Sequence, residues 1–189
     1  VAVLTMVMGS VLAVTQSDIK RVLAFSSIAH TGFILLGVTS TSGQSLAAVL
    51  IYLFAYGFTT LGSFAIVSLV RSPSGEATHI SQWAGLGKKS PLVAGIFGLY
   101  LLALAGIPLT SGFTAKFAVF TAAVEVGATP YVYVAVVTSA IAAFFYGRII
   151  VLMFFTPAND KTADVVVPSS LTSVSIGITA ALTVVVGVF

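Results

Sequence analysis

Charged residues are scarce in this sequence. Only 7% of its 189 residues are charged and 58% are hydrophobic, whereas a soluble domain carries about 25% charged residues. A compact fold with so little polar surface does not stay in solution, so the composition excludes a soluble protein and indicates a membrane protein. The net charge of +3 comes from scattered Lys and Arg. These residues do not form the clustered basic patch that is typical of nucleic-acid binding.

Cysteine is absent, which excludes a disulfide scaffold, a thiolate metal site, an iron–sulfur cluster and a Cys nucleophile. The sequence also lacks a nucleophile triad, a Walker loop, a dinucleotide fingerprint, a pair of carboxylates and residues at metal-ligand spacing. The sequence contains protonatable groups but no recognisable set of residues for redox or bond-making chemistry. Both ends of the sequence lie within apolar stretches and no targeting signal is visible, so we expect a piece of a longer chain.

Long apolar runs dominate what remains. A helix needs about 20 apolar residues to cross a bilayer, and residues 46–70, 131–155 and 171–189 meet that length. Residues 91–126 would suffice for two crossings. We therefore expect a single all-α transmembrane domain over residues 1–189, a polytopic helix bundle of about six or seven transmembrane helices.

A helix break is predicted at residues 106–112. Five of the six prolines lie at the edges of apolar runs, but Pro108 lies inside one, between Gly106 and Gly112. A helix must break there while at or near membrane depth. Non-helical backbone in a bilayer is tolerated only where protein or a wet cavity covers it, and broken helices are typical of ion-transporting folds.

Two regions leave alternatives open. Residues 1–15 and 19–39 form either two helices joined by a polar turn, with Lys20 at the interface, or one helix to about Phe25 that carries Lys20 into the membrane. Residues 71–90 form a polar loop, in which residues 80–86 have the composition of a short interfacial helix. The lone Trp83 in that segment is interpreted as an interface anchor.

Ionisable groups within the spans are the candidate functional residues, because a Lys or Arg at a helix centre costs about 2.5–3.5 kcal/mol on insertion scales. Lys116 lies deep in its run, and burial among phenylalanines would favour its neutral form, so that it could exchange a proton near neutral pH. The alternative is a structural lysine whose amine meets carbonyls freed by the break. Lys20 is a second candidate if its helix is continuous, and an interfacial flank if not.

His30 has Ser26 one turn earlier on its helix face. It is either a histidine satisfied by a backbone carbonyl or part of a proton relay. Tyr52 and Tyr56 share a helix face with Thr59, as a supporting polar path or a simple hydrogen-bonding stripe.

The remaining charged residues receive simpler interpretations. Arg148 interrupts a span near its end, where it would snorkel or pair with a carboxylate, and Glu125 is expected at the interface. Loop residues such as His79, Lys88 and Lys89 are expected to be solvated.

Two motifs resemble a known family. Residues 18–33, DIKRVLAFSSIAHTGF, resemble one signature of the antiporter-like subunits of respiratory complex I, and residues 105–117, AGIPLTSGFTAKF, resemble another. The first signature is shared with cation/proton antiporter and membrane-hydrogenase subunits. The second, together with His30, is most similar to the N-type branch of the complex I family.

The resemblance implies a larger fold and a set of roles. The family has about fourteen transmembrane helices with two inverted repeats, of which this chain would supply the second half, roughly helices eight to fourteen. Lys20 would then lie at the channel centre, which favours the continuous helix. Lys116 would lie on the discontinuous twelfth helix, and His30 on the polar axis that tyrosines line. Further residues of the path would lie upstream of Val1.

The function that the resemblance implies is proton translocation in the bacterial cell membrane by a subunit of NADH-quinone oxidoreductase, driven by quinone reduction elsewhere. NADH, flavin, iron–sulfur clusters and quinone would be bound by partner subunits, and no cofactor or metal by this chain. The expected partners are other membrane subunits, including neighbouring antiporter-like ones. The alternatives are a sodium/proton antiporter or membrane-hydrogenase subunit, and a purely structural subunit.

Overall fold

The protein is a helix bundle in a computed structural model that describes residues 1–39, 43–73, 75–160 and 162–188. Within these residues the α-helices are α1 (Ala2–Thr15), α2 (Ile19–Val38), α3 (Gly43–Leu69), α4 (Leu86–Lys89), α5 (Pro91–Ala105), α6 (Ser111–Glu125), α7 (Thr129–Phe155) and α8 (Ser170–Val188). The predicted all-α membrane bundle is confirmed.

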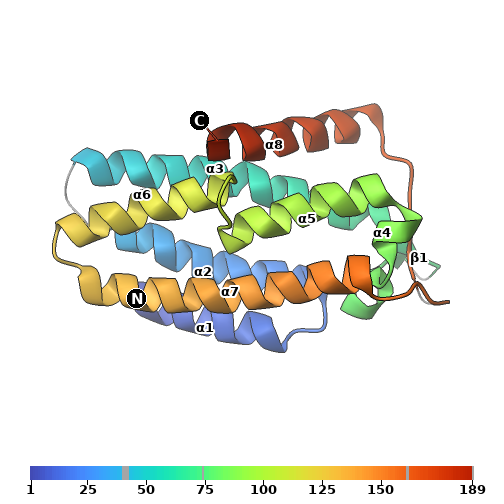
Figure 1. Cartoon of the computed structure of the whole chain (residues 1–189), viewed down its shortest axis with the longest axis horizontal. Coiled ribbons are helices and arrows are strands. Elements are labelled where there is room, and N and C mark those ends of the chain that lie inside the picture. Colours follow the sequence, from blue (N-terminus) through green and yellow to red (C-terminus); the bar gives the residue numbers. More distant parts are fainter. Residues whose placement is uncertain (40–42, 74, 161, 189) are drawn as a thin grey trace.

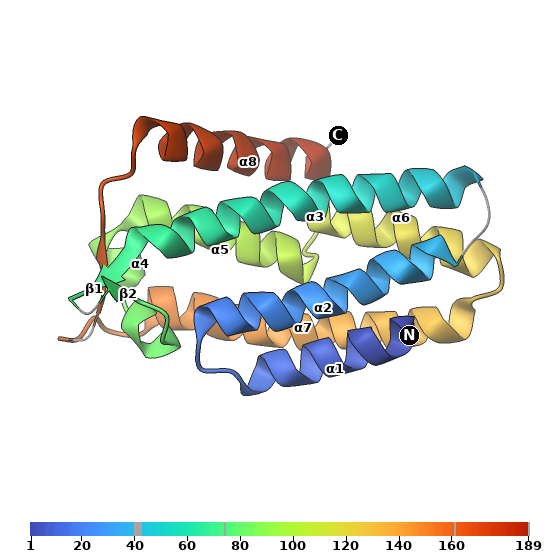
Figure 2. The same cartoon turned by 180° about the vertical axis from the view of Figure 1, so that it is seen from behind.

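The helices, apart from the short α4, run along the long axis of the molecule in layers (Figures 1 and 2). The α1 helix lies at one edge beside α2 and α7, α8 lies at the opposite edge, and α3, α5 and α6 lie between. Four helices of the described part are long and apolar enough to cross a membrane, namely α2, α3, α7 and α8, and α1 and α5 are shorter apolar helices.

The predicted break is present, and it interrupts one crossing. The α5 and α6 helices lie end to end, so that together they cross the bundle once, with the break in the middle (Figure 1). The first half ends because Gly106 adopts the left-handed conformation at φ 84°, and Pro108 follows. A Cβ on Gly112 would collide with the carbonyl oxygen of Ala103, so only glycine allows the two halves to approach this closely.

The continuous-helix alternative for the first 39 residues is wrong. The α1 helix ends at Thr15 and α2 begins at Ile19. The Asp18 carboxylate caps α2 by accepting a hydrogen bond from the Arg21 N–H at 3.0 Å. The turn is also tied to the polar loop, because the Ile19 N–H donates to the Thr78 carbonyl at 2.7 Å. Local capping and a distant loop thus stop the helix where hydropathy alone left the choice open.

The polar loop after α3 contains structure that the sequence did not predict. Strands β1 (Val70–Ser72), β2 (Gly75–Glu76) and β3 (Asp164–Val165) form a small antiparallel sheet in the order β2-β1-β3. The sheet, α4 and the α1–α2 turn gather at one end of the bundle, and the α6–α7 turn lies at the other (Figures 1 and 2). Residues distant in sequence therefore form a cap over one end.

Trp83 is not an interface anchor. It closes the short 3₁₀-helix η1 (Ile80–Trp83) and is fully buried. Its indole N–H donates to the Ala77 carbonyl at 2.8 Å, and its ring lies 4.9 Å from that of Phe97 on α5. The loop folds back onto the helices, so Trp83 is a core residue that fastens the cap to the bundle.

Replacing Trp83 should therefore destabilise the protein. Trp83→Ala is expected to cost about 3–5 kcal/mol because it leaves a large cavity, and Trp83→Phe should cost less, because it keeps much of the packing but loses the hydrogen bond, worth about 1 kcal/mol. The thermal unfolding midpoint of the full-length protein in detergent measures both. Leu92→Ala on α5, where the side chain is 74% exposed, is the control; equal midpoints for Trp83→Ala and the control would contradict the anchoring role.

Candidate functional site

Lys116 lies at the centre of the broken crossing, and its side chain reaches back across the break. The residue is 5% exposed. Its Nζ donates hydrogen bonds to the carbonyls of Leu104 and Ala105 at 3.0 and 2.9 Å, and to the Ser139 hydroxyl of α7 at 2.9 Å. An ammonium has three donors, so each has an acceptor. Nζ also lies 5.3 Å from the centre of the Phe33 ring, which adds a favourable cation–π contact.

The break is what makes this position suitable for a cation. The last carbonyls of a helix have no partner within it, and the C-terminus carries a partial negative charge. Leu104 and Ala105 end α5, and the Lys116 amine occupies the place where the next turn would have donated. This is the contact that the structural interpretation of Lys116 predicted, and the same acceptors suit a protonated amine.

His30 faces the break from α2. Its ring is 3% exposed, and Nδ1 lies 2.8 Å from the Tyr52 hydroxyl of α3. The imidazole stacks on Tyr56 with ring centres 4.7 Å apart. Nε2 makes no hydrogen bond with the described residues, and Leu104, whose carbonyl accepts from Lys116, lines the cavity beside the imidazole. Leu104 therefore borders both the lysine and the histidine.

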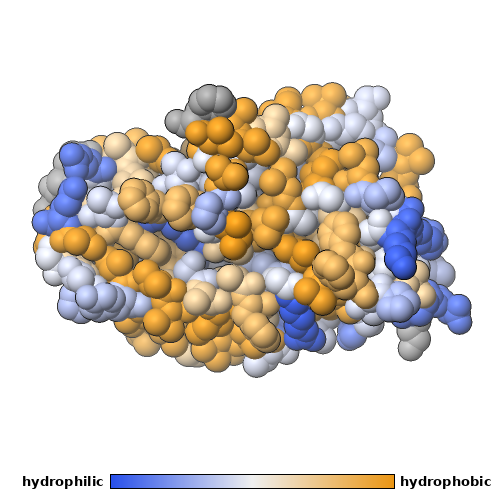
Figure 3. Space-filling view, in the orientation of Figure 1, coloured by the Kyte–Doolittle hydropathy of each residue, from blue (hydrophilic) through white to orange (hydrophobic). Residues whose placement is uncertain are grey.

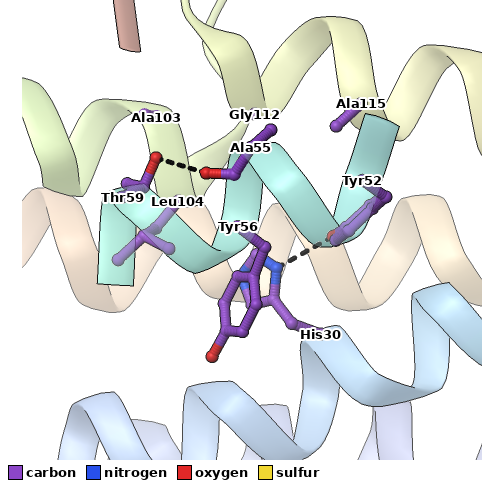
Figure 4. A pocket seen from close by; sticks show the side chains of 9 residues that line it. All are labelled: His30, Tyr52, Ala55, Tyr56, Thr59, Ala103, Leu104, Gly112 and Ala115. Carbon is purple, nitrogen blue, oxygen red and sulfur yellow. Dashed lines mark hydrogen bonds between the residues drawn. The ribbon is translucent and has the colours of Figure 1, made fainter. Parts of the chain in front are cut away.

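A small cavity lies between α2, α3 and the break. His30, Tyr52, Tyr56 and Thr59 line one side, and backbone of the break, including Gly112, lines the other (Figure 4). Its volume, counted as positions open to the centre of a water molecule, is about 10 Å³, near the lower limit of ~10–15 Å³ for one ordered water. The structure thus brings together His30 and the predicted supporting residues Tyr52, Tyr56 and Thr59.

Polar contacts continue along α2 toward its N-terminal end. Ser26 hydrogen bonds to the Tyr146 hydroxyl of α7, and the Tyr56 hydroxyl donates to Ser27 at 2.6 Å. Sequence reasoning identified Ser26 but missed Tyr146, Ser27 and Ser139. The sequence contained a pattern that could have identified two of them. Ser139 and Tyr146 are polar residues seven positions apart in an apolar run, so they share one helix face.

Lys20 does not join this group. It is the second residue of α2, ten residues or ~15 Å along the helix before His30. Its half-exposed amine pairs with Glu76 of β2, and an Arg71 guanidinium nitrogen lies 3.7 Å from the same carboxylate. The expectation that Lys20 lies at the centre of the channel is wrong, because the helix begins just before it and the polar loop supplies its counter-charge.

The other charged residues lie away from the cavity. Arg148 is exposed on α7 and forms no ion pair with the residues that the structure describes. Glu125 ends α6 and is exposed, as predicted for an interfacial residue. Lys89 is not simply solvated, because it pairs with Asp164 at 2.6 Å. Among the described residues no cluster of three or more His, Asp or Glu is placed to hold a metal ion.

Comparison with known proteins agrees with this geometry. A family model described as "NADH:quinone oxidoreductase/Mrp antiporter, TM" matches residues 1–142. The chain therefore belongs to this family of multi-pass membrane proteins. Within the family its relatives are of the N type: NADH-quinone oxidoreductase subunit N of Rhodococcus opacus is 59% identical over 188 residues, and that of Mycobacterium bovis is 50% identical over 192. The predicted resemblance to this branch is confirmed.

The matches cover all of this chain but only 35% and 36% of those two relatives, so the chain spans about a third of their length. Among solved structures, a chain of respiratory complex I from Thermus thermophilus with bound aureothin has a TM-score of 0.85 at 30% identity, with 98% of this chain and 42% of that chain covered. A chain of the Mrp complex from Dietzia has a TM-score of 0.83 at 25% identity, with 99% and 43% covered.

The Lys20–Glu76 pair should make stability depend on pH. The hydrogen bond from the Lys20 ammonium lowers the pKa of the Glu76 carboxyl from its ordinary value of 4.5. The stabilisation is therefore present above pH 4.5 and is lost as the pH falls through the lowered folded-state pKa. We expect Glu76→Gln to lower the thermal midpoint slightly at pH 7, since both groups are partly exposed, and to have no effect at the acid end. Glu125→Gln is the control, and a difference independent of pH would contradict the assignment.

Proposed function

We propose that this chain is part of a membrane subunit that translocates protons in an NADH-quinone oxidoreductase of a bacterial cell membrane. The names of its relatives support the membership of that enzyme complex. Other membrane subunits, including antiporter-like neighbours, would be its partners. NADH, flavin, iron–sulfur clusters and quinone would be bound elsewhere, and the described residues would contribute proton transfer without redox chemistry.

The observation that carries the proposal is the arrangement of Lys116 and His30 around the helix break, where the Leu104 carbonyl accepts from Lys116 and Leu104 lines the cavity beside His30. Both side chains are buried, and two positive charges close together in a low-dielectric interior repel strongly. Protonation of one therefore disfavours protonation of the other, so the pair titrates as a coupled unit. A proton that leaves Lys116 makes His30 easier to protonate.

A proton would move between the two groups through the cavity beside His30. One ordered water there would have the imidazole, the tyrosine hydroxyls and the Thr59 hydroxyl around it. Tyr52 hydrogen bonds to Nδ1, so it holds the ring in place and leaves Nε2 to exchange the proton. Ser26 and Tyr146 would extend the path along α2. Lys20 would be a further proton-exchanging group of the path, at the end of the bundle and outside the pair of Lys116 and His30.

Removing the Lys116 amine should reduce proton transport. In the assembled complex reconstituted in vesicles, we expect Lys116→Met to lower the rate of NADH-driven proton transport per complex roughly tenfold or more, since a positioned proton-transfer group contributes about 10²–10⁴ in rate. Lys88→Met, in the exposed part of α4, is the matched control. Ser139→Ala removes one of the acceptors of the amine and should have a smaller effect.

The same experiment separates function from structure. If Lys116 only stabilises the break, Lys116→Met would reduce the amount of assembled complex but leave the rate of proton transport per complex unchanged in the complex that remains. That result would refute the proton-carrying role.

A second candidate is a subunit of a cation/proton antiporter. It is favoured by the similarity to the Mrp complex chain and by the name of the family model. The curated relatives, which are named for NADH-quinone oxidoreductase, favour the first proposal. Transport that requires NADH supports the redox-linked function, whereas transport driven by a sodium gradient without NADH supports the antiporter.

A further inference from the structure

The helix break is exposed on the side of the bundle, midway between its ends (Figure 1). The side chains of Ile107 and Leu109 are 41% and 70% exposed, and Pro108 between them is exposed too. Leu109 has φ at 70°, a left-handed conformation that a branched side chain rarely adopts. This backbone is therefore irregular, strained and uncovered at membrane depth.

Within the described residues, backbone polar groups of Pro108 and Leu109 lack partners, whereas those of Ile107 are hydrogen-bonded. In the part of the chain that the structure describes, the Leu109 N–H and the carbonyls of Pro108 and Leu109 form no hydrogen bond. Lipid chains offer neither donors nor acceptors, so irregular backbone at this depth is tolerated only when protein or a water-filled cavity covers it. A surface that faces only lipid is therefore inconsistent with the geometry of the break.

The α8 helix covers only part of the break. Its Gly187 packs so closely on Thr110 that a Cβ there would collide with the Thr110 backbone. Beyond the break, Phe113 and Phe117 of α6 stack with ring centres 6.0 Å apart and are 39% and 64% exposed. The surface over α5 and α6 is largely hydrophobic (Figure 3). We define the break face as Ile107, Pro108, Leu109, Phe113 and Phe117.

We propose that the break face packs against a further membrane helix of the same protein, from the part outside these 189 residues. The chain spans about a third of the length of its relatives, so about two thirds of a protein of that size remains to be packed. A tethered helix acts at a high effective concentration, so it covers the unpaired backbone as soon as the chain is inserted, before other subunits assemble.

The chemistry of the break face defines the helix that fits it. Its surface must be apolar to pack on Phe113 and Phe117, and small residues would let it approach the backbone at Leu109 closely. It must also present a hydroxyl or carboxamide side chain, since the break offers unpaired donors as well as unpaired acceptors. The proposal depends on the fold and the membrane location and does not require the proton-transfer role of Lys116.

Site-specific photo-cross-linking in the complete protein tests the proposal. A p-benzoylphenylalanine replaces Leu109 in one variant and Phe117 in another, the latter as an aromatic exchange that preserves folding. After irradiation in membranes, mass spectrometry identifies the cross-linked partner. The same photoreactive residue at Leu61, 70% exposed on the regular helix α3, is the matched control, where lipid adducts are expected because no unpaired backbone requires cover.

Cross-links from positions 109 and 117 to a segment of the same chain outside the 189 residues support the proposal. They should persist when the complete subunit is expressed without its partners. Adducts with lipid alone, cross-links confined to these 189 residues, or cross-links to another subunit that vanish when the subunit is expressed alone would each overturn it.

Discussion

The structure depends on one interaction, the contact between the Lys116 ammonium and the carbonyls at the end of α5. A broken helix leaves acceptors without donors, and a lysine in a membrane is a donor without acceptors. The unpaired carbonyls and the buried lysine each raise the free energy of the protein in a membrane when they stand alone. Hydrogen bonding between them lowers both of these free-energy penalties. Breaking the helix at Gly106 therefore lets an apolar bundle hold a cation at its centre.

The rest of the site is organised around that contact. Gly112 brings the two half-helices close enough for the amine to reach the carbonyls, and Leu104 borders both the lysine and His30. A cavity of the size of one water lies beside the imidazole. A structural role and a proton-carrying role for Lys116 thus need not compete, since the contact that stabilises the break also holds the charge where it influences the histidine.

Predictions from the sequence succeeded where local chemistry decides. A proline between glycines in an apolar run predicted the break. The sequence also named His30 and Tyr52 as candidates for one polar path, and the structure shows a hydrogen bond between them, while the path itself stays a prediction. Lys20 and Trp83 were misplaced for a common reason. Lys20 pairs with Glu76 of the polar loop, and Trp83, which lies in that loop, packs against Phe97 of α5. Neither partner is identifiable from hydropathy.

The sequence by itself determined the membrane class, the approximate spans and the helix break, because each follows from composition or from the backbone limits of proline and glycine. Only the tertiary structure decided which acceptors surround Lys116, that Tyr146 and Ser139 contribute from α7, and that Lys20 lies at the end of the bundle. Those features depend on contacts between separate elements of the fold, and the free energy of such contacts is set by packing rather than by the local sequence.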